Sequence, residues 1–195
     1  MSICPITYRE CGDRRYSERG LRLLSPRLKG LIVFPYDAQA QREEAAIRGG
    51  KMSIQGVQPK LSARLNIKQS VFDIVIRGGH YIIKPQHHIY PQLPENEDLT
   101  MRLAATVEID VPLHGLMYCR DGTFSYFIKR FDRIGPHGKV AIEDFAQLAG
   151  LTRDSKYDFS MEKLLKIVDE YCTFPMLEKI KLFKRTVFNF IVGNE

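Results

Sequence analysis

Residues 52–60 (MSIQGVQPK) are the part of the sequence whose residue types could perform chemistry, because a glycine and a lysine stand just before a strand-like segment. Backbone N–H groups in a turn around Gly56 can bind phosphate oxygens, and the ammonium group of Lys60 would add a positive charge. The segment is not a Walker A loop, since Gly-x4-Gly-Lys occurs nowhere in the chain. On these residues alone, a plain tight turn with a solvated lysine is the favoured alternative.

Three further groups of residues follow that segment in order. Lys84 stands at the end of a predicted strand, after two isoleucines in the segment IIKP (82–85), and Glu97 stands at the beginning of a predicted helix. In kinase-like folds a strand lysine and a helix glutamate in this arrangement form an ion pair. Lys129, Arg130 and Phe131 end a predicted strand, where such folds bind adenine through backbone hydrogen bonds. Each group alone is typical of a surface charge or a core strand. Their order along the chain indicates the nucleotide-binding half of a kinase-like protein.

The elements that would position these residues follow from the spacing of apolar side chains. Alternation of apolar and polar residues predicts strands at 61–66, 72–76, 81–84, 111–117 and 124–131. The first three strands are expected to form an antiparallel meander. Proline and acidic residues begin a predicted helix at Pro94, whose apolar side would be Leu99, Leu103 (with Ala104) and Val107. Further helices are expected at 38–48, 142–149, 161–171 and 176–192.

These elements predict an α+β fold, in which an antiparallel sheet of about five strands with one helix precedes the helices of a second lobe. The expected domains are a basic N-terminal lead-in with a short helix (1–50) and a kinase-like N-lobe with a Gly-rich loop (51–134). A hinge and the start of a helical C-lobe (135–195) would follow. Pro136 and Gly138 mark the change from strands to helices.

The composition of the 195-residue chain is that of an ordinary globular protein, with 44% hydrophobic and 27% charged residues. No apolar run reaches the roughly 18–20 residues that span a bilayer, and the N-terminus lacks secretory features, so a cytoplasmic protein is expected. Lys and Arg number 29 against 23 Asp and Glu, which gives a net charge of +6. The basic residues are dense only between Arg14 and Lys29, so charge alone does not identify a partner.

Neither the cysteines nor the histidines indicate a metal site. Cys4, Cys11, Cys119 and Cys172 form no C-x-x-C pair, which favours reduced thiols over zinc ligands. The histidines are expected in solvated loops (His80, His87 and His88) or in the core or a turn (His114).

The ordered motifs resemble one family. The chain is similar to the HipA-type serine/threonine kinase toxins, and most similar to HipT, the kinase of the three-part HipBST toxin–antitoxin systems. The matching segments are SIQGVQPKL (53–61), YIIKP (81–85), ENE (95–97), VPLHGL (111–116), FIKRFDR (127–133) and FNFIVGN (188–194). The start of the chain also resembles HipT, since no equivalent of the small extra N-terminal subdomain of full HipA proteins, which HipS resembles, is expected in it.

The resemblance implies a role for each segment. Residues 53–60 would be the flexible loop over the phosphates of ATP, with nucleotide contacts at Gln55, Gly56, Val57, Gln58, Pro59 and Lys60. Lys84 would contact the phosphates, with Glu97 as its ion-pair partner. The hinge would consist of Lys129, Arg130 and Phe131.

Ser53 matches the loop serine that members of the family autophosphorylate. A phosphate on Ser53 would compete with ATP for the same hydrogen-bond donors and force the loop out of the site. Gln55 stands where many HipT-like loops carry a second serine, so the resemblance does not imply control at two sites.

By the same resemblance, the residues of phosphoryl transfer are expected just after Glu195, so no catalytic residue and no metal ligand is assigned within the chain. An Asp-x-His-x-x-Asn loop there would orient the substrate hydroxyl and hold Mg²⁺. The complete enzyme would transfer the γ-phosphate of Mg-ATP to a serine of a translation protein such as an aminoacyl-tRNA synthetase. HipS-like and HipB-like antitoxins would be its partners.

Two other interpretations remain open from the sequence. The chain could be a truncated, catalytically inactive remnant that acts as a nucleotide- or antitoxin-binding module. The basic segment between Arg14 and Lys29 could instead bind nucleic acid, with an affinity that falls steeply with salt. In HipBST-type systems the DNA contacts belong to HipB, so direct contact with nucleic acid is not expected here.

Overall fold

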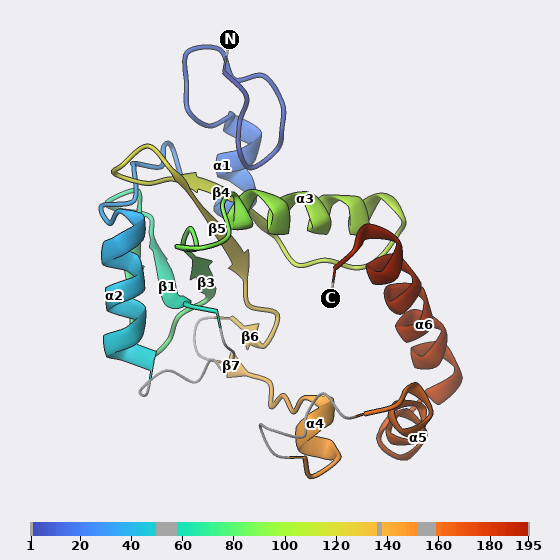
Figure 1. The fold of residues 1–195 in the computed structure, drawn as a ribbon. Helices are drawn as coiled ribbons and strands as arrows, with labels where there is room; N and C mark the ends of the chain where they lie inside the picture. Colours follow the sequence, from blue (N-terminus) through green and yellow to red (C-terminus); the bar gives the residue numbers. More distant parts are fainter. Residues whose placement is uncertain (1, 50–57, 136–137, 152–158, 195) are drawn as a thin grey trace.

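The computed structural model describes residues 2–49, 58–135, 138–151 and 159–194 and shows an α+β protein with a central antiparallel sheet (Figure 1). Helices α1 (Glu18–Leu24), α2 (Ala38–Gly49) and α3 (Leu93–Thr106) lie around the sheet. Helices α4 (Phe145–Leu148), α5 (Met161–Tyr171) and α6 (Pro175–Val192) follow it in the chain. The α+β class predicted from the sequence is therefore confirmed.

The central sheet has the strand order β2-β1-β3-β5-β4, with antiparallel neighbours throughout. Its strands are β1 (Leu61–Asn66), β2 (Val71–Ile74), β3 (Tyr81–Lys84), β4 (His114–Tyr118) and β5 (Phe124–Lys129). The predicted meander is wrong, because β3 pairs with β1 and not with β2. This pairing sets Ile83 opposite Leu61 and Tyr81 opposite Ala63, and it buries all four side chains. A two-stranded sheet, β6 (Arg133–Ile134) and β7 (Gly138–Lys139), follows β5.

Residues 2–49 share one hydrophobic core with the sheet. Their buried side chains are Cys4, Ile6, Tyr16, Leu21, Leu24, Leu28, Leu31, Phe34 and Ala45, which cluster with Leu61, Ile83 and Phe127. The sequence predicted only one helix here and missed α1, which begins after Ser17, whose side chain accepts the Gly20 N–H. These apolar residues follow no single period, because most of them lie in turns and extended segments.

Helix α3 lies against β4 and β5, and it carries a proline in its first turn as predicted. Its predicted apolar side is wrong for Leu99, Leu103 and Val107, which are 41–48% exposed, and is confirmed for Ala104. The other buried positions are Pro94 and Asp98. An aspartate can occupy this face because His114 and Arg102 hydrogen-bond to its carboxylate.

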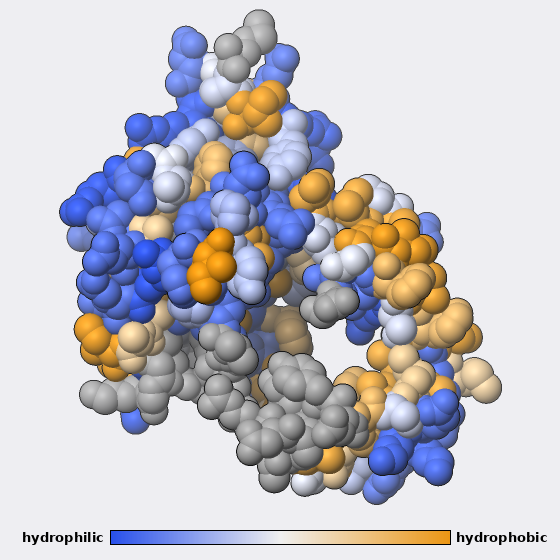
Figure 2. All heavy atoms as spheres, viewed as in Figure 1, coloured by the Kyte–Doolittle hydropathy of each residue, from blue (hydrophilic) through white to orange (hydrophobic). Residues whose placement is uncertain are grey.

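The C-terminal helices begin and end at recognisable caps. Ser160 caps α5, and α6 runs from Pro175 to the left-handed Gly193. The helix predicted at 142–149 is shorter, because Asp144 caps it and so fixes the first helical residue at position 145. No residue of α6 is buried, and Figure 2 shows apolar side chains over this helix, with an opening between it and the sheet.

Candidate functional site

Lys84 and Glu97, which the sequence pairs, form an ion pair with 2.8 Å between Lys84 Nζ and Glu97 Oε2. Lys84 ends β3, and Glu97 lies near the beginning of α3, which crosses the same face of the sheet. The ammonium group also lies 5.8 Å from the centre of the Tyr126 ring, the neighbour of Lys84 on β5. The two charged side chains are 25% and 21% exposed, so the pair is packed in place while a ligand can still reach it.

A pair of isoleucines continues this face of the sheet from Lys84 towards the predicted hinge. Ile82 and Ile128 are register partners, two residues from Lys84 and Tyr126 respectively, so all four side chains point to one side of the sheet. Both isoleucines are half-buried and lie outside the main core cluster. Sequence reasoning missed them as site residues, because an isoleucine in a strand resembles any other core position. Only the register shows that they lie between Lys84 and the hinge.

The predicted hinge residues follow the opposite end of the β3–β5 ladder. Tyr81 pairs with Lys129 while Lys84 pairs with Tyr126, so about 10 Å of strand separates the ion pair from the hinge. That separation is comparable with the distance between the base and the phosphates in an extended ATP molecule. The backbone N–H of Lys129 donates to Leu113 O at 2.7 Å, and that of Arg130 donates to His80 O at 2.8 Å. These two amides are therefore used within the fold.

The side chains of the hinge residues differ in their contacts. Arg130 forms a two-pronged ion pair with Asp132, with nitrogen–oxygen distances of 2.8 and 2.7 Å, and Arg133 lies 3.2 Å from the same carboxylate. Hydrogen bonds from Arg130 hold the pKa of Asp132 below its usual range. Phe131 is 75% exposed and belongs to no core cluster. The arginines therefore fix the shape of the hinge, and the ring of Phe131 is left exposed beside them.

A cavity of about 660 Å³ lies beside the hinge. Its wall combines the hinge, the segment before β4 and one residue of α6: Asp110, Val111, Pro112, Leu113, Lys129, Arg130, Phe131, Arg133 and Arg185. Neither Lys84 nor Glu97 lines it. The structure thus brings Lys84 and Glu97 together at one place and Lys129, Arg130 and Phe131 together at another, along one pair of strands.

The predicted phosphate loop is only partly described. Ser53, Gln55, Gly56 and Val57 lie outside the described residues, while Gln58, Pro59 and Lys60 lead directly into β1. Within the described part, the buried side-chain nitrogen of Gln58 has no hydrogen-bond partner. Because β1 pairs with β3, the chain enters the sheet next to the strand that carries Lys84.

Asp98, the residue after Glu97, is fully buried and anchors α3. His114 Nδ1 lies 2.8 Å from one carboxylate oxygen, and Arg102 Nε lies 2.7 Å from the other. Burial disfavours the charged form, but the hydrogen bonds from His114 and Arg102 outweigh it and hold the pKa of Asp98 below its usual range. Asp98 is therefore a fixed negative charge that sets the rotation of α3 and, with it, the direction of Glu97.

Comparison with known proteins places this geometry in a family. The model of the HipA-like C-terminal domain matches residues 52–195. This chain belongs to the HipA-like family. All of the predicted site residues, from Ser53 to Phe131, fall inside the matched range, whereas residues 1–51 fall outside it.

Two bacterial relatives carry the name "Putative kinase". The one from Haemophilus influenzae is 30% identical over 192 residues, covering 92% of this chain and 55% of the relative. The one from Sinorhizobium fredii is 33% identical over 184 residues, covering 82% of this chain and 42% of the relative. The HipA-like chain therefore spans about half the length of the curated relatives it matches, and these names support a kinase at the level of the family.

A solved structure shares the fold. The HipA toxin of Shewanella oneidensis, solved in a complex with HipB and its operator DNA, matches with a TM-score of 0.57 and 21% sequence identity. The match covers 86% of the HipA-like chain and 45% of the toxin chain. At this level of identity the likeness establishes the fold alone.

The described residues of the HipA-like chain contain no cluster of typical metal ligands. Within them, no group of three or more His, Cys, Asp or Glu side chains is placed to hold a metal ion. His87 belongs to a loop in which its ring stacks on Tyr90, and His114 pairs with Asp98. Cys4 and Cys119 are buried free thiols. In the part that the structure describes, no helix has the length and apolar character to cross a membrane.

Proposed function

We propose that residues 1–195 form the ATP-binding half of a HipT- or HipA-like serine/threonine kinase toxin of a type II toxin–antitoxin system. The Lys84–Glu97 ion pair carries this proposal, because a strand lysine held by a helix glutamate is the phosphate-contacting arrangement of kinases. The apolar surface of Ile82 and Ile128 would contact the base, between the ion pair and the hinge. The family match supports the assignment to a kinase.

In this proposal Lys84 binds the phosphates of ATP through its ammonium group, and Glu97 orients that group. Residues 53–60 would add backbone N–H donors over the phosphates, with contacts at Gln55, Gly56, Val57, Gln58, Pro59 and Lys60. The hinge of Lys129, Arg130 and Phe131 would receive adenine at its backbone. The N–H groups of Lys129 and Arg130 already have partners, so the base would use other backbone groups of this segment.

The reaction would pass the γ-phosphoryl group of ATP to a serine hydroxyl of a protein and leave ADP, while the hydroxyl loses its proton. An aminoacyl-tRNA synthetase is the proposed class of substrate, and HipS-like and HipB-like antitoxins are the proposed partners. Mg²⁺ would neutralise the phosphate charge when bound. The contribution of Lys84 is to hold the phosphates in place and to offset negative charge. Phosphorylation of Ser53 would switch the site off, since its dianion would compete for the same donors.

ATP binding to the 195-residue chain tests this proposal. Lys84→Ala is expected to weaken binding about tenfold or more, because a charge-assisted hydrogen bond contributes about 1.5–3 kcal/mol and 1.4 kcal/mol corresponds to tenfold. Lys68→Ala is the matched control, since it removes the same charge from an exposed position between β1 and β2. Titration calorimetry with ATP, with and without Mg²⁺, gives the affinities, and circular dichroism checks the fold.

Two results would contradict the proposal. One is an equal loss of ATP affinity in Lys84→Ala and Lys68→Ala, which would mean that only net charge matters. The other is the absence of measurable ATP binding in the unaltered chain. A stable complex with a HipS-like or HipB-like protein, formed without ATP binding, would favour the inactive binding module instead.

A further inference from the structure

Glu95 and Asp98, which stand on either side of Glu97 on α3, are both linked to the segment that precedes the family domain. The family model begins at residue 52, yet residues 2–49 reach the first turns of α3 from two sides. One contact passes through α2 to Glu95, and the other passes from the first eight residues to Asp98. Glu97 lies between these two points in the chain.

The first contact runs from α2 across the end of β3. Arg42 Nη1 donates to the backbone oxygen of Gln86 at 2.9 Å. The side-chain nitrogen of Gln86 in turn donates to Glu95 Oε2 at 2.7 Å. All three residues are partly buried, so these hydrogen bonds are shielded from water. Since Gln86 follows Lys84 by two residues, the contact fixes the strand end and the helix start together.

The second contact joins the N-terminal residues to Asp98. Arg102 Nη2 donates to Ile6 O at 2.9 Å, while its Nε bonds Asp98 at 2.7 Å. The guanidinium group also stacks over the Tyr8 ring, 3.7 Å from its centre. Arg102 therefore bridges a buried carboxylate of α3 and the backbone of the first eight residues.

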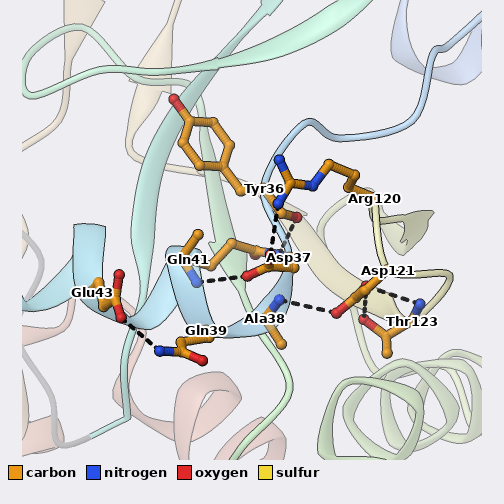
Figure 3. Close-up of polar contacts among 10 residues, drawn as sticks. Tyr36, Asp37, Ala38, Gln39, Gln41, Glu43, Arg120, Asp121 and Thr123 are labelled. Atoms are coloured by element: carbon orange, nitrogen blue, oxygen red, sulfur yellow. Dashed lines mark hydrogen bonds and ion pairs between the residues drawn. The ribbon is translucent and has the colours of Figure 1, made fainter.

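Helix α2 is itself firmly attached, which lets it act as a support. At its start, Asp37 pairs with Arg120 at 3.0 Å, and the Ala38 N–H donates to Asp121 at 3.2 Å (Figure 3). Further along, the fully buried Gln41 accepts a hydrogen bond from Ser125 at 2.8 Å. These contacts tie α2 to β5 and to the turn that precedes it, so a displacement of α2 is resisted at both places.

We propose that residues 2–49 position the Lys84–Glu97 pair, with Arg42 and Tyr8 as positioning residues that act on Glu97 through Glu95 and Asp98. The inference rests on the proposed function only where it concerns ATP affinity. It assigns to residues 2–49, which precede the range that the family model covers, a part in shaping the nucleotide site. Neither Arg42 nor Tyr8 contacts Lys84 or Glu97 in the described structure, so each acts through another residue.

Hydrogen exchange and ATP binding on the full 195-residue chain test the inference together. Arg42→Ala is expected to speed amide exchange several-fold in residues 93–100 and to weaken ATP binding about threefold. Arg48→Ala is the matched control, because it removes an arginine of the same helix whose ion pair, with Glu44, lies within α2. Tyr8→Leu tests the second contact and keeps an apolar side chain at that position. It therefore keeps the inference testable if Arg42→Ala does not fold.

A double-mutant cycle distinguishes positioning from a general structural effect. If Arg42 acts through Glu97, Arg42→Ala has no further effect on ATP affinity in a Glu97→Gln background. An equal loss in both backgrounds, or unchanged exchange in residues 93–100 for both Arg42→Ala and Tyr8→Leu, would overturn the inference. If the unaltered chain does not bind ATP, the proposed function fails, and the exchange experiment alone then decides whether residues 2–49 position α3.

Discussion

The sheet region (residues 2–134) and the C-terminal helices α5 and α6 differ sharply in how they use aromatic and charged residues. In the sheet region Phe127 is fully buried, and it packs against Phe72 and Tyr81. On α6, Phe183 and Phe190 are 68% and 88% exposed. The buried ion pair Arg130–Asp132 belongs to the first region, whereas Lys179–Asp169 between α5 and α6 is largely exposed on its acidic side. The ion pair of the site lies wholly in the closely packed region.

This difference indicates where the geometry of the site comes from. Helix α6 packs on α5, and it reaches the sheet region through Lys184, whose Nζ lies 3.4 Å from the backbone oxygen of Glu108. The Lys84–Glu97 pair is instead held by β3, by α3 and by the N-terminal segment. We therefore expect changes on the exposed face of α6, away from Arg185 in the cavity wall, to leave nucleotide affinity unaltered. Changes in the core under β3 and β5 should alter the whole molecule.

Replacing Phe127 should have the largest effect. Phe127→Ala removes a fully buried ring from the centre of the core and is expected to lower the free energy of unfolding by about 3–5 kcal/mol. Phe190→Ala, the same change on the exposed face of α6, is expected to stay within about 0.5 kcal/mol. Urea denaturation followed by circular dichroism measures both. Similar losses in the two variants would erase the contrast between the regions.

The Asp98 cluster should give the next largest effect, and it should depend on pH. Asp98→Ala leaves Arg102 and His114 without their carboxylate and is expected to cost about 3 kcal/mol at pH 7. The pKa of Asp98 lies below its unfolded value, so this stabilisation is present above about pH 4 and is lost as pH falls through the lower, folded-state pKa. Denaturation between pH 3 and 7 should show the variant and the unaltered chain converging in acid. A constant difference over that range would contradict the assignment.

The sequence was sufficient to predict the strands and the ion pair but not the surroundings of the pair. Alternation located β1 and β3, because their inward residues face one core. Alternation could not predict that β3 pairs with β1, because the order of strands in a sheet depends on how their buried side chains pack together. Lys84 and Glu97 could be paired from their order in the chain, whereas Ile82 and Ile128 needed the register of β3 and β5.

The parts that sequence analysis missed share one physical cause: they depend on contacts far apart in the chain. The buried face of α3 contains Asp98, which a search for apolar spacing rejects. Its burial depends on Arg102 and on His114, which lies 16 residues away in the sequence. Arg102 reaches Ile6, 96 residues away. A basic lead-in without periodicity gives no local indication of such partners. Long-range polar contacts therefore limited the prediction more than the choice between helix and strand.

Within the sheet region, buried and exposed hydroxyl groups should differ as the two regions do. Ser125 is 1% exposed and donates to Gln41, so Ser125→Ala would leave a buried oxygen of Gln41 without its donor. We expect a loss of about 1–2 kcal/mol in the free energy of unfolding. Thr123, on the same hairpin, makes an exposed hydrogen bond to Asp121, and Thr123→Ala should change stability by less than about 0.5 kcal/mol (Figure 3). Chemical denaturation measures the free energy of unfolding of both variants. A larger loss in Thr123→Ala than in Ser125→Ala would contradict this expectation.

The smallest effect on stability is expected at the ion pair itself. Lys84 and Glu97 are 25% and 21% exposed, so water screens their attraction, and Glu97→Gln should lower the free energy of unfolding by less than about 1 kcal/mol. The same substitution should weaken ATP binding, because Lys84 would lose the carboxylate that orients it. A large loss of stability with unchanged ATP affinity would mean that the pair supports the fold and not a site. A small loss of stability with a clear loss of ATP affinity would mean that the pair serves nucleotide binding. The closely packed region would then hold the pair in place, while the pair itself contributes little to the stability of the protein.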